Sequence, residues 1–344
     1  MSTSRYEQAG VSIDAQDQAI NGIKGHVAST ETNRVLSNLG SFGGLFDIKF
    51  PAMEHPVLVS SADGVGTKLK IAFMSDRNNT VGQCLVNHCI NDILVQGAAP
   101  LFFMDYIATG KLKPNVVEQV IAGMAVACRT SGLAILGGEM AEMPGFYNAG
   151  EYDVAGFIVG VVDKPKLLGA DRVRKGQKLI GLPSSGLHTN GYSLARQIIF
   201  EEQKLGLNDV IPGVGATVAD ALLAVHKPYF KTVEALLADD KIAAMAHITG
   251  GGFLDNMPRV LPAHLDAAIR ADATPVPPLF QYLVDTGKVD REEAYRVFNM
   301  GVGLIMAVDD AHVDAVLDHT RGIEGDAWVM GEIVDGSGVV QMTW

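Results

Sequence analysis

The chain has 344 residues, which is about two domains' worth of sequence. Hydrophobic residues make up 48% and charged residues 19%, a composition typical of a folded globular protein and not of a disordered one. The formal net charge of −12 argues against non-specific binding to nucleic acid or to an anionic membrane. This charge does not exclude the binding of small anionic ligands, because helix N-termini, a few lysines and metal ions can bind them locally.

Short apolar runs alternate with segments of helical periodicity in the first half of the chain. A glycine-rich stretch, Asn38–Gly44, comes before them and is either a mobile lid or a loop without function. In Asn115–Arg129 the apolar residues recur at helical spacing, so we expect a helix there. The other elements expected in this half are strands at Val57–Ala62, Leu101–Ile107, Ala134–Leu136 and Val154–Val162 and a helix at Val81–Gln96.

A charged segment separates this half from the second. Asp163–Gly176 has seven charged residues in fourteen and includes Pro165, so we place the domain boundary there, with domains at 1–168 and 169–344. Beyond it we expect strands at Lys178–Leu182, Ala267–Arg270 and Val302–Val308 and helices at Tyr192–Glu202, Val218–Leu237, Arg291–Phe298 and Ala311–His319. Mixed strands and helices of this kind predict an α/β or α+β protein.

The common signatures of nucleotide and hydrolytic sites are missing from the sequence. It has no G-x-x-x-x-G-K-[ST] loop, no G-x-G-x-x-G that opens a helix after a strand, no H-E-x-x-H and no G-x-S-x-G. A P-loop ATPase, a Rossmann dehydrogenase, a zincin and an α/β-hydrolase are therefore disfavoured.

The first polar motif, DGVGTK, directly follows the strand expected at Val57–Ala62. Its glycines, Gly64 and Gly66, let the backbone turn closely around a ligand, and Asp63 and Lys68 flank them. Chemistry on Mg²⁺-bound phosphate needs this pairing of hard oxygen ligands and a positive group. The alternative is a polar turn with an incidental ion pair.

The second motif is a polar stripe on the helix expected at Val81–Gln96. Asn87, His88, Asn91 and Asp92 lie on one face of that helix. A solvated helix face normally carries Lys, Glu or Arg, and this stripe has none of them. We therefore expect it to be internal or to face a site.

The third motif, GGEMAEMPG, contains Gly137, Gly138, Glu139 and Glu142 after a short strand. Two carboxylates framed by glycine and proline fit a metal or acid–base site better than a plain turn, which favours Asn, Asp or Ser. Because no histidine or cysteine accompanies them, the metal would be Mg²⁺ or Mn²⁺ and not zinc.

The second half offers two glycine-rich turns that lead from strands into helices, a pattern that presents backbone N–H groups to an anion. Each turn also supplies a histidine, which is either a proton-transfer group or a hydrogen-bonded structural residue. The candidates are Ser185, Gly186, His188 and Asn190 in the first turn and His247, Thr249, Gly250 and Gly251 in the second, with Asn299 at the edge of a later strand.

The cysteines and the N-terminus indicate the compartment. Cys84, Cys89 and Cys128 form no C-x-x-C pair, and the first residues have no apolar core typical of a signal peptide. The longest uncharged runs, such as Val154–Val162, are too short to span a membrane. We expect a cytoplasmic, ATP-using enzyme that acts on a phosphorylated small molecule.

At these residues the sequence closely resembles the phosphoribosylformylglycinamidine cyclo-ligases, also called aminoimidazole ribonucleotide synthetases. The resemblance covers nearly the whole chain through YEQAGVSID, DGVGTK, CINDILVQGAAPLFFMDYIATGKL, GGEMAEMPG, YDVAGFIVGVV, SSGLHTNGYSL, HITGGGF, NMPRVLP and FNMGVG. It implies an α/β fold with an N-terminal sheet that pairs across a homodimer into a β-barrel, and an α/β C-terminal domain. It also implies conversion of ATP and formylglycinamidine ribonucleotide into aminoimidazole ribonucleotide, ADP and phosphate, by phosphorylation of the formamide oxygen and attack of the amidine nitrogen.

The resemblance also implies roles for single residues. Asp63, Asp92 and Glu139 would hold Mg²⁺, and His188, His247 and Lys24 would act in catalysis. The nucleotide would be bound by Lys24, Asp63, Gly64, Lys68, Asn91, Asp92, Gly137, Gly138 and Glu139. The substrate would be bound by Glu142, Ser185, Gly186, His188, Asn190, Thr249, Gly250, Gly251 and Asn299.

Two other functions are open to this sequence. A small-molecule kinase of the same fold would leave a stable phosphorylated product and release no phosphate. A nucleotide-binding module without catalysis would have lost at least one of the carboxylates, and all of them are present.

Overall fold

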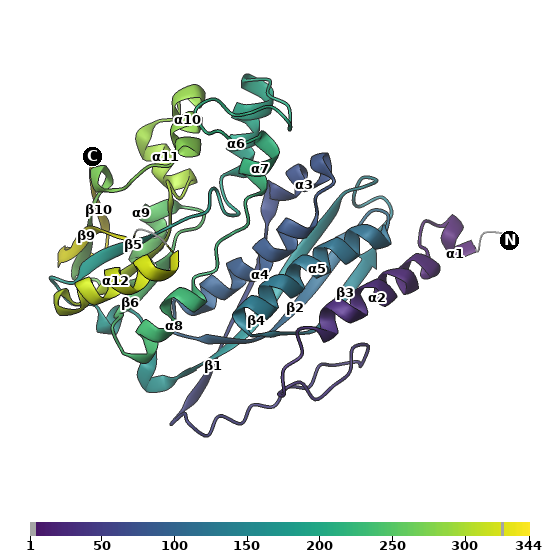
Figure 1. Ribbon diagram of the computed structural model, residues 1–344, viewed down its shortest axis with the longest axis horizontal. Coiled ribbons are helices and arrows are strands. Elements are labelled where there is room, and N and C mark those ends of the chain that lie inside the picture. Colours follow the sequence, from purple (N-terminus) through teal and green to yellow (C-terminus); the bar gives the residue numbers. More distant parts are fainter. Residues whose placement is uncertain (1–4, 325–326) are drawn as a thin grey trace.

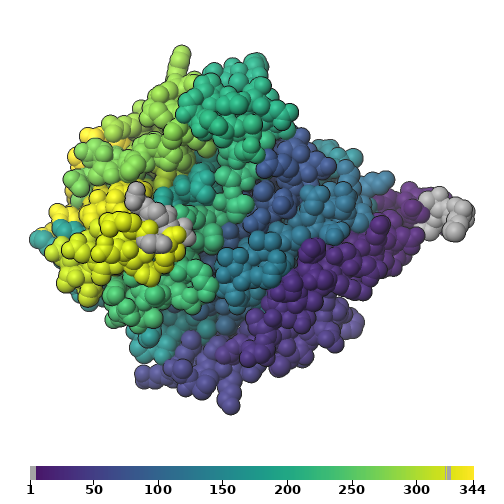
Figure 2. Space-filling model, in the orientation of Figure 1, coloured from purple at the N-terminus to yellow at the C-terminus, as the bar shows by residue number. Residues whose placement is uncertain are grey.

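The computed structural model describes residues 5–324 and 327–344, which form two mixed β-sheets with helices packed on them (Figure 1). The prediction of a mixed α/β fold is confirmed. The half of the chain that contains the first sheet and the half that contains the second lie against each other (Figure 2).

The first sheet has four strands in the order β1-β4-β2-β3. β2 is parallel to β3, and the other neighbours are antiparallel. Their bounds are β1 Pro56–Gly64, β2 Ala99–Thr109, β3 Ala134–Glu142 and β4 Tyr152–Asp163. Helices α4 and α5 cover one face, and α2 packs on α5 (Figure 1). The helices of this half are α1 Arg5–Gln8, α2 Ile13–Ala28, α3 Leu69–Ser75, α4 Asn79–Leu94 and α5 Pro114–Ser131.

The other face of this sheet is apolar and largely open. Leu58, Met104 and Phe157 point to it and are 56%, 38% and 46% exposed. The loop between α2 and β1 passes over a part of it, with the ring of Phe46 5.1 Å from that of Phe102. Among the residues with described positions, no helix packs on this face, which we call the open face.

α4 and α5 approach each other through glycine. A Cβ atom at Gly82 would lie 2.0 Å from Val120 O, and one at Gly123 would lie 1.9 Å from Asn79 O. Gly123→Ala should therefore force the helices apart and lower the free energy of unfolding, measured in urea, by about 2–3 kcal/mol. Gly25→Ala is the control, because nothing lies within 4 Å of that position in α2, and it should be neutral or stabilising. Equal stability of Gly123→Ala and the wild type would contradict the close packing.

The second sheet has six strands in the order β10-β7-β9-β5-β8-β6. β10 is parallel to β7, and the other pairs are antiparallel. The strands are β5 Lys178–Pro183, β6 Ala244–His247, β7 Leu265–Arg270, β8 Val302–Val308, β9 Trp328–Asp335 and β10 Val340–Thr343. The helices are α6 Tyr192–Arg196, α7 Val218–Leu223, α8 Phe230–Ala238, α9 Gly252–Asn256, α10 Pro278–Gly287, α11 Arg291–Val297 and α12 Val313–Glu324.

All seven predicted strands are present, and β6, β9 and β10 were not predicted. β3 is longer than predicted and continues through the glycines to Glu142. The helix predicted at Val218–Leu237 is wrong, because α7 ends at Leu223 and α8 begins at Phe230. Pro228 explains this break, since proline has no N–H and disfavours a helical residue before it. The helix predicted at Tyr192–Glu202 continues from α6 as a π-helical turn at Gln197–Glu202.

No helix in the described part of the chain has the length and hydrophobicity needed to cross a membrane.

Candidate functional site

The polar stripe of α4 is buried where the two halves of the chain meet. Asn87 Nδ2 donates to His226 O at 2.7 Å. Asn91 Nδ2 donates to Lys227 O at 2.8 Å, and Asn91 Oδ1 accepts from Tyr229 N at 3.0 Å. The prediction of an internal stripe is confirmed, because Asn87 and Asn91 are 4% and 0% exposed. These amides fix the segment between α7 and α8 on α4.

Four buried histidines gather beside this stripe. The ring of His188 stacks on that of His226, with centroids 4.0 Å apart. His226 Nε2 lies 3.1 Å from His247 Nε2, within hydrogen-bond distance. His88 Nδ1 lies 2.7 Å from Thr189 Oγ1, which also lies 3.3 Å from His226 Nδ1. The cluster joins one residue of α4 to three that lie in the second half.

Two carboxylates close the ends of this cluster. Asp63 Oδ2 lies 2.8 Å from His88 Nε2. Asp92 Oδ1 lies 2.8 Å from His247 Nδ1, and Asp92 Oδ2 accepts from Ser61 Oγ at 3.1 Å. A continuous chain of hydrogen-bond distances therefore runs through Asp63, His88, Thr189, His226, His247 and Asp92.

Burial and charge set different protonation states along this chain. Burial lowers the pKa of His88, but the neighbouring Asp63 and Asp92 raise it above its ordinary value. Burial holds the pKa of His188 and of His226 well below the ordinary value, so these rings are neutral near pH 7. Burial would raise the pKa of Asp92, but the hydrogen bond from His247 lowers it below its ordinary value. The site thus combines the ionised carboxylate of Asp92 with the neutral imidazoles of His188 and His226.

His188 itself has an unusual backbone and an unpaired ring nitrogen. Its φ of 59° lies in the left-handed region, which is uncommon for a residue other than glycine. Its Nε2 accepts from Ser185 N at 3.2 Å, so the ring proton lies on Nδ1. That Nδ1 is buried without a hydrogen-bond partner in the described structure.

An open cavity of about 530 Å³ lies beside the cluster, and we call it the histidine cavity. Its polar wall consists of Asp63, His88, Asp153, Thr189 and Asn190, with the backbone of Gly64 and Gly66. Asp63, His88 and Thr189 are therefore the members of the hydrogen-bond chain that border this cavity. Predicted residues from both halves meet here.

Lys68 does not line this cavity. Its ammonium is fully buried and donates to His188 O at 2.9 Å, Ala224 O at 2.6 Å and Cys84 Sγ at 3.1 Å. Since an ammonium has three N–H groups, none is left for a phosphate. The geometry gives Lys68 a structural position in place of the expected nucleotide contact.

The two glutamates of the third motif are separated by the strand they lie on. Residues three apart on a strand point to opposite faces, so Glu139 and Glu142 do not share a site. Glu142 accepts from Ser12 N at 2.7 Å and Leu112 N at 2.8 Å, and it anchors the start of α2. The Glu142 carboxylate therefore binds backbone N–H groups of the protein itself, whereas a contact with the substrate was expected.

Glu139 lies away from Asp63 and Asp92. Its strand, β3, is three strands from β1, which corresponds to roughly 14 Å. The register places Glu139, Tyr106, Ala155 and Gly64 in one row across the four strands. Asp63 is adjacent to Gly64 and points to the other face. Within one chain, the expected metal set of Asp63, Asp92 and Glu139 does not assemble.

Gly137, Gly138 and Glu139 line a second cavity of about 290 Å³ at the edge of the first sheet, which we call the β3 cavity. The glycine-rich stretch Asn38–Gly44 forms its other wall. Lys24 is on α2, which also lines this cavity, but Lys24 is exposed and donates to Asn21 Oδ1 at 2.8 Å. Of the predicted nucleotide residues, two line the histidine cavity and three line the β3 cavity, whereas Lys24, Lys68, Asn91 and Asp92 line neither.

The glycine turns of the second half are held by their own side chains. Asn299 Nδ2 donates to Gly186 O at 2.9 Å, and Ser184 Oγ donates to Asn299 Oδ1 at 3.0 Å. Ser185 Oγ donates to Val225 O. The second turn is fixed by Asn256 Nδ2, which lies within hydrogen-bond distance of the carbonyls of Thr249, Gly250 and Gly252. Gly251 there has φ 92°.

The donor sets can be compared with the needs of metal ions. Asp63 and Asp92 offer the carboxylate oxygens that Mg²⁺ prefers, and both approach His88 Nε2, at 2.8 and 3.7 Å. They fit Mg²⁺, whereas Glu139 does not join them. A group of three histidines, His188, His226 and His247, also has ring nitrogens close together, but His188 Nε2 already accepts from Ser185 N and is not free for an ion.

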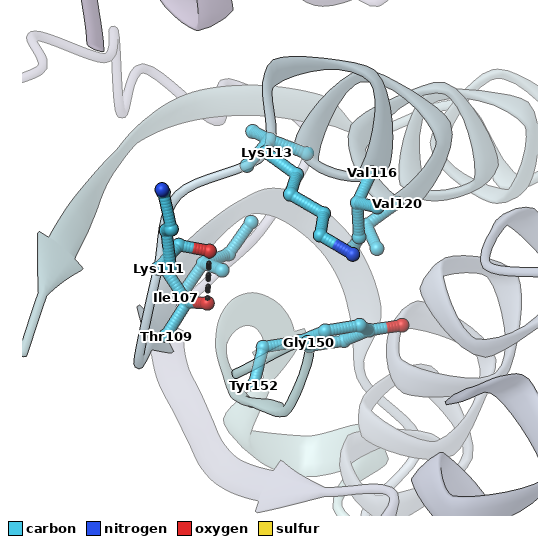
Figure 3. A pocket seen from close by; sticks show the side chains of 9 residues that line it. Ile107, Thr109, Lys111, Lys113, Val116, Val120, Gly150 and Tyr152 are labelled. Atoms are coloured by element: carbon cyan, nitrogen blue, oxygen red, sulfur yellow. Dashed lines mark hydrogen bonds between the residues drawn. The ribbon is translucent and has the colours of Figure 1, made fainter. Parts of the chain in front are cut away.

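A small cavity near the start of α5 is too small for a ligand. It has a volume of about 20 Å³ and lies between Lys113 and the ring of Tyr152 (Figure 3). Thr109 Oγ1 donates to Lys111 O at 3.1 Å along its rim. A single water would fill it.

His226 and Thr189 are site residues that the sequence analysis did not single out. Thr189 lies inside the predicted motif SSGLHTNGYSL, between two residues that were named. His226 lies in the segment that was predicted as helix. The pair Lys227-Pro228 is the signal that could have placed it in a loop.

Comparison with known proteins gives matches in both halves of the chain. The family model described as AIR synthase related protein, N-terminal domain, matches residues 48–162, and that of the C-terminal domain matches residues 174–342. A phosphoribosylformylglycinamidine cyclo-ligase of Geobacter sulfurreducens is 50% identical over 328 residues, covering 95% of this chain and 94% of that protein. One from Thermoanaerobacter sp. is 49% identical over 335 residues, covering 97% and 99%.

Solved structures share the fold at low sequence identity. Thiamine-monophosphate kinase from Stenotrophomonas maltophilia superposes with a TM-score of 0.70 at 17% identity, covering 94% of this chain and 95% of that one. The hydrogenase maturation protein HypE from E. coli has a TM-score of 0.69 at 20% identity, covering 96% and 94%. HypE in complex with ATP has a TM-score of 0.64 at 18% identity, covering 92% and 88%.

Proposed function

The chain belongs to the phosphoribosylformylglycinamidine cyclo-ligase family, and from this membership we propose how its residues divide the reaction. It is an ATP-dependent ligase of purine biosynthesis that closes the ring of formylglycinamidine ribonucleotide to give aminoimidazole ribonucleotide. The observation that carries this conclusion is the high identity along almost the whole chain, both halves included.

In the proposed chemistry, ATP phosphorylates the formamide oxygen and releases ADP. The amidine nitrogen then attacks the formyl carbon, the C–O bond breaks and phosphate leaves with the oxygen. Positioning the amidine against the activated carbon is expected to supply much of the rate enhancement. Such positioning can lower the activation free energy by roughly 7–11 kcal/mol. The reaction needs no protein nucleophile.

We place the reacting end of the substrate in the histidine cavity. The attacking nitrogen must lose a proton, and we favour the neutral ring of His247 as the acceptor, because His188 Nε2 already accepts from Ser185 N. The ring of His247 is buried, at 6% exposure, so the proton reaches it through His88 and Thr189, which border the cavity. The link between these groups is the chain of hydrogen-bond distances from Asp63 to Asp92.

The nucleotide is proposed to extend between the two cavities. The row from Glu139 to Gly64 joins the β3 cavity to the histidine cavity over roughly 14 Å, a span that an extended nucleoside triphosphate can cover. Asp63 and Asp92 would hold Mg²⁺ at the phosphate end. When bound, this ion would neutralise charge on the transferred phosphoryl group.

The open face of the first sheet supports a homodimer. Leu58, Met104 and Phe157 expose apolar surface there, and a large exposed apolar patch marks an interaction site. We propose that the sheet of a second copy packs on this face and that the two sheets form a barrel. We also place the protein in the cytoplasm, where its three free and buried cysteines stay reduced.

A product assay tests the reaction. The purified full chain is given Mg²⁺, ATP and formylglycinamidine ribonucleotide, and ADP, phosphate and aminoimidazole ribonucleotide are quantified. We expect the three products in equal amounts. A phosphorylated product that accumulates without free phosphate would indicate a kinase and contradict the proposal.

A further inference from the structure

The β3 cavity has a lining that suits a flat, apolar ligand. It is bounded by side chains from α2, the loop after it, β2, α5 and β3, among them Ile20, Val27, Leu39, Met104, Ile121 and Leu136. Its volume of about 290 Å³ is large enough for a heterocyclic base. Pockets of this kind bind by apolar contact and use a few placed polar groups for specificity.

One buried carboxyl lies among these apolar side chains, whereas Glu139, which also lines the cavity, is exposed. Asp105 is on β2, lines the cavity and is 7% exposed. No other described residue donates a hydrogen bond to its carboxyl group, and burial raises its pKa to about 7. A buried carboxyl whose only protein donor is its own backbone N–H is costly unless a ligand completes its hydrogen bonds.

The neighbouring strand leaves room for this carboxyl. Gly138 is paired with Asp105 in the β2–β3 register, and a Cβ atom there would lie 2.5 Å from Asp105 Oδ1. Any other residue at position 138 would displace the carboxyl. The glycine of the third motif therefore serves Asp105, a residue that the sequence analysis did not single out.

We propose that Asp105 recognises the adenine base of ATP, through hydrogen bonds between its carboxyl group and the amino edge of the ring. In its protonated form the C=O accepts from the exocyclic amino group and the O–H donates to the adjacent ring nitrogen. The apolar side chains of the cavity contact the two faces of the ring. This inference rests on the proposed function, since it assigns the base-binding end of the ATP site.

Two substitutions at this position separate hydrogen bonding from packing. Asp105→Asn keeps an acceptor beside a donor, so the KM for ATP should stay within about threefold of the wild type. Asp105→Leu keeps the size of the side chain but makes no hydrogen bond, so the KM for ATP should rise by roughly 10- to 100-fold while kcat changes less. Thermal unfolding of both variants checks that they are folded.

A nucleotide analogue gives a test that needs no variant. Purine riboside triphosphate lacks the exocyclic amino group, and the wild-type protein should bind it at least about tenfold more weakly than ATP. Asp105→Leu should no longer distinguish the two nucleotides. Equal binding of both nucleotides by the wild type, or an unchanged KM for ATP in folded Asp105→Leu, would overturn the role of Asp105. Failure of the wild type to form aminoimidazole ribonucleotide would instead overturn the proposed function.

Discussion

Replacement of Asp92 by asparagine is expected to lower kcat by roughly 10³-fold while the protein folds normally. Asp92 accepts from His247 Nδ1 at 2.8 Å and from Ser61 Oγ at 3.1 Å. Asparagine has the same shape but offers one oxygen and no charge, so one of these donors loses its acceptor. It also removes a proposed Mg²⁺ ligand. Release of ADP, phosphate and aminoimidazole ribonucleotide measures the effect.

Asp163→Asn is the matched control for this substitution. Asp163 lies at the end of β4, outside both cavities, and accepts from the backbone N–H groups of Glu54 and His55. Its kcat should stay within about twofold of the wild type. Turnover of Asp92→Asn at the wild-type rate would remove Asp92 from the catalytic site, and a lowered thermal midpoint would show that folding was affected.

The elements that could be predicted are those that a local sequence pattern identifies. The apolar runs of β1, β2, β4 and β8 are long enough to identify each strand without knowledge of its neighbours. The stripe on α4 could be recognised as internal because it lacks long charged side chains. β6 and β10 are strands of only four residues, and their pairing with β8 and β7 depends on contacts distant in sequence.

Many residues of the site could be named from the sequence, but their arrangement in space could not be predicted. Lys68 was expected at a phosphate because it flanks two glycines together with Asp63, yet the fold buries its ammonium among backbone carbonyls. Glu139 and Glu142 were expected together because β3 was predicted to end at Leu136. Since β3 continues to Glu142, the strand alternation separates them.

The position of His226 could not be predicted from the sequence for a different reason. Its segment has helical periodicity on both sides, and only Pro228 marks the interruption. The segment is extended because Asn87 and Asn91 of α4 take its backbone groups. Those partners lie more than 130 residues away in sequence, so no local pattern could identify them.

Replacement of Lys68 by methionine is expected to give the largest loss of stability, about 3–5 kcal/mol in the free energy of unfolding. Burial alone would lower the pKa of Lys68, but the adjoining Cys84 and Tyr192 raise it, so the group stays charged. Methionine fills the same space and donates no hydrogen bond. The carbonyl oxygens of His188 and Ala224 would then lose this donor. Urea denaturation of the full chain measures the change.

The same substitution should also reduce turnover, because Lys68 holds the backbone that positions the histidine cluster. His188 has its positive φ directly beside the carbonyl that Lys68 binds, and Thr189 follows it in the chain. Lys70→Met is the control: Lys70 forms a partly exposed ion pair with Glu151, and its loss should change stability by less than about 1 kcal/mol. If Lys68 instead contacted the nucleotide, Lys68→Met would raise the KM for ATP and leave the unfolding free energy near that of Lys70→Met. A large loss of stability with a smaller change in KM would identify the ammonium as the link that holds the two halves of the site together.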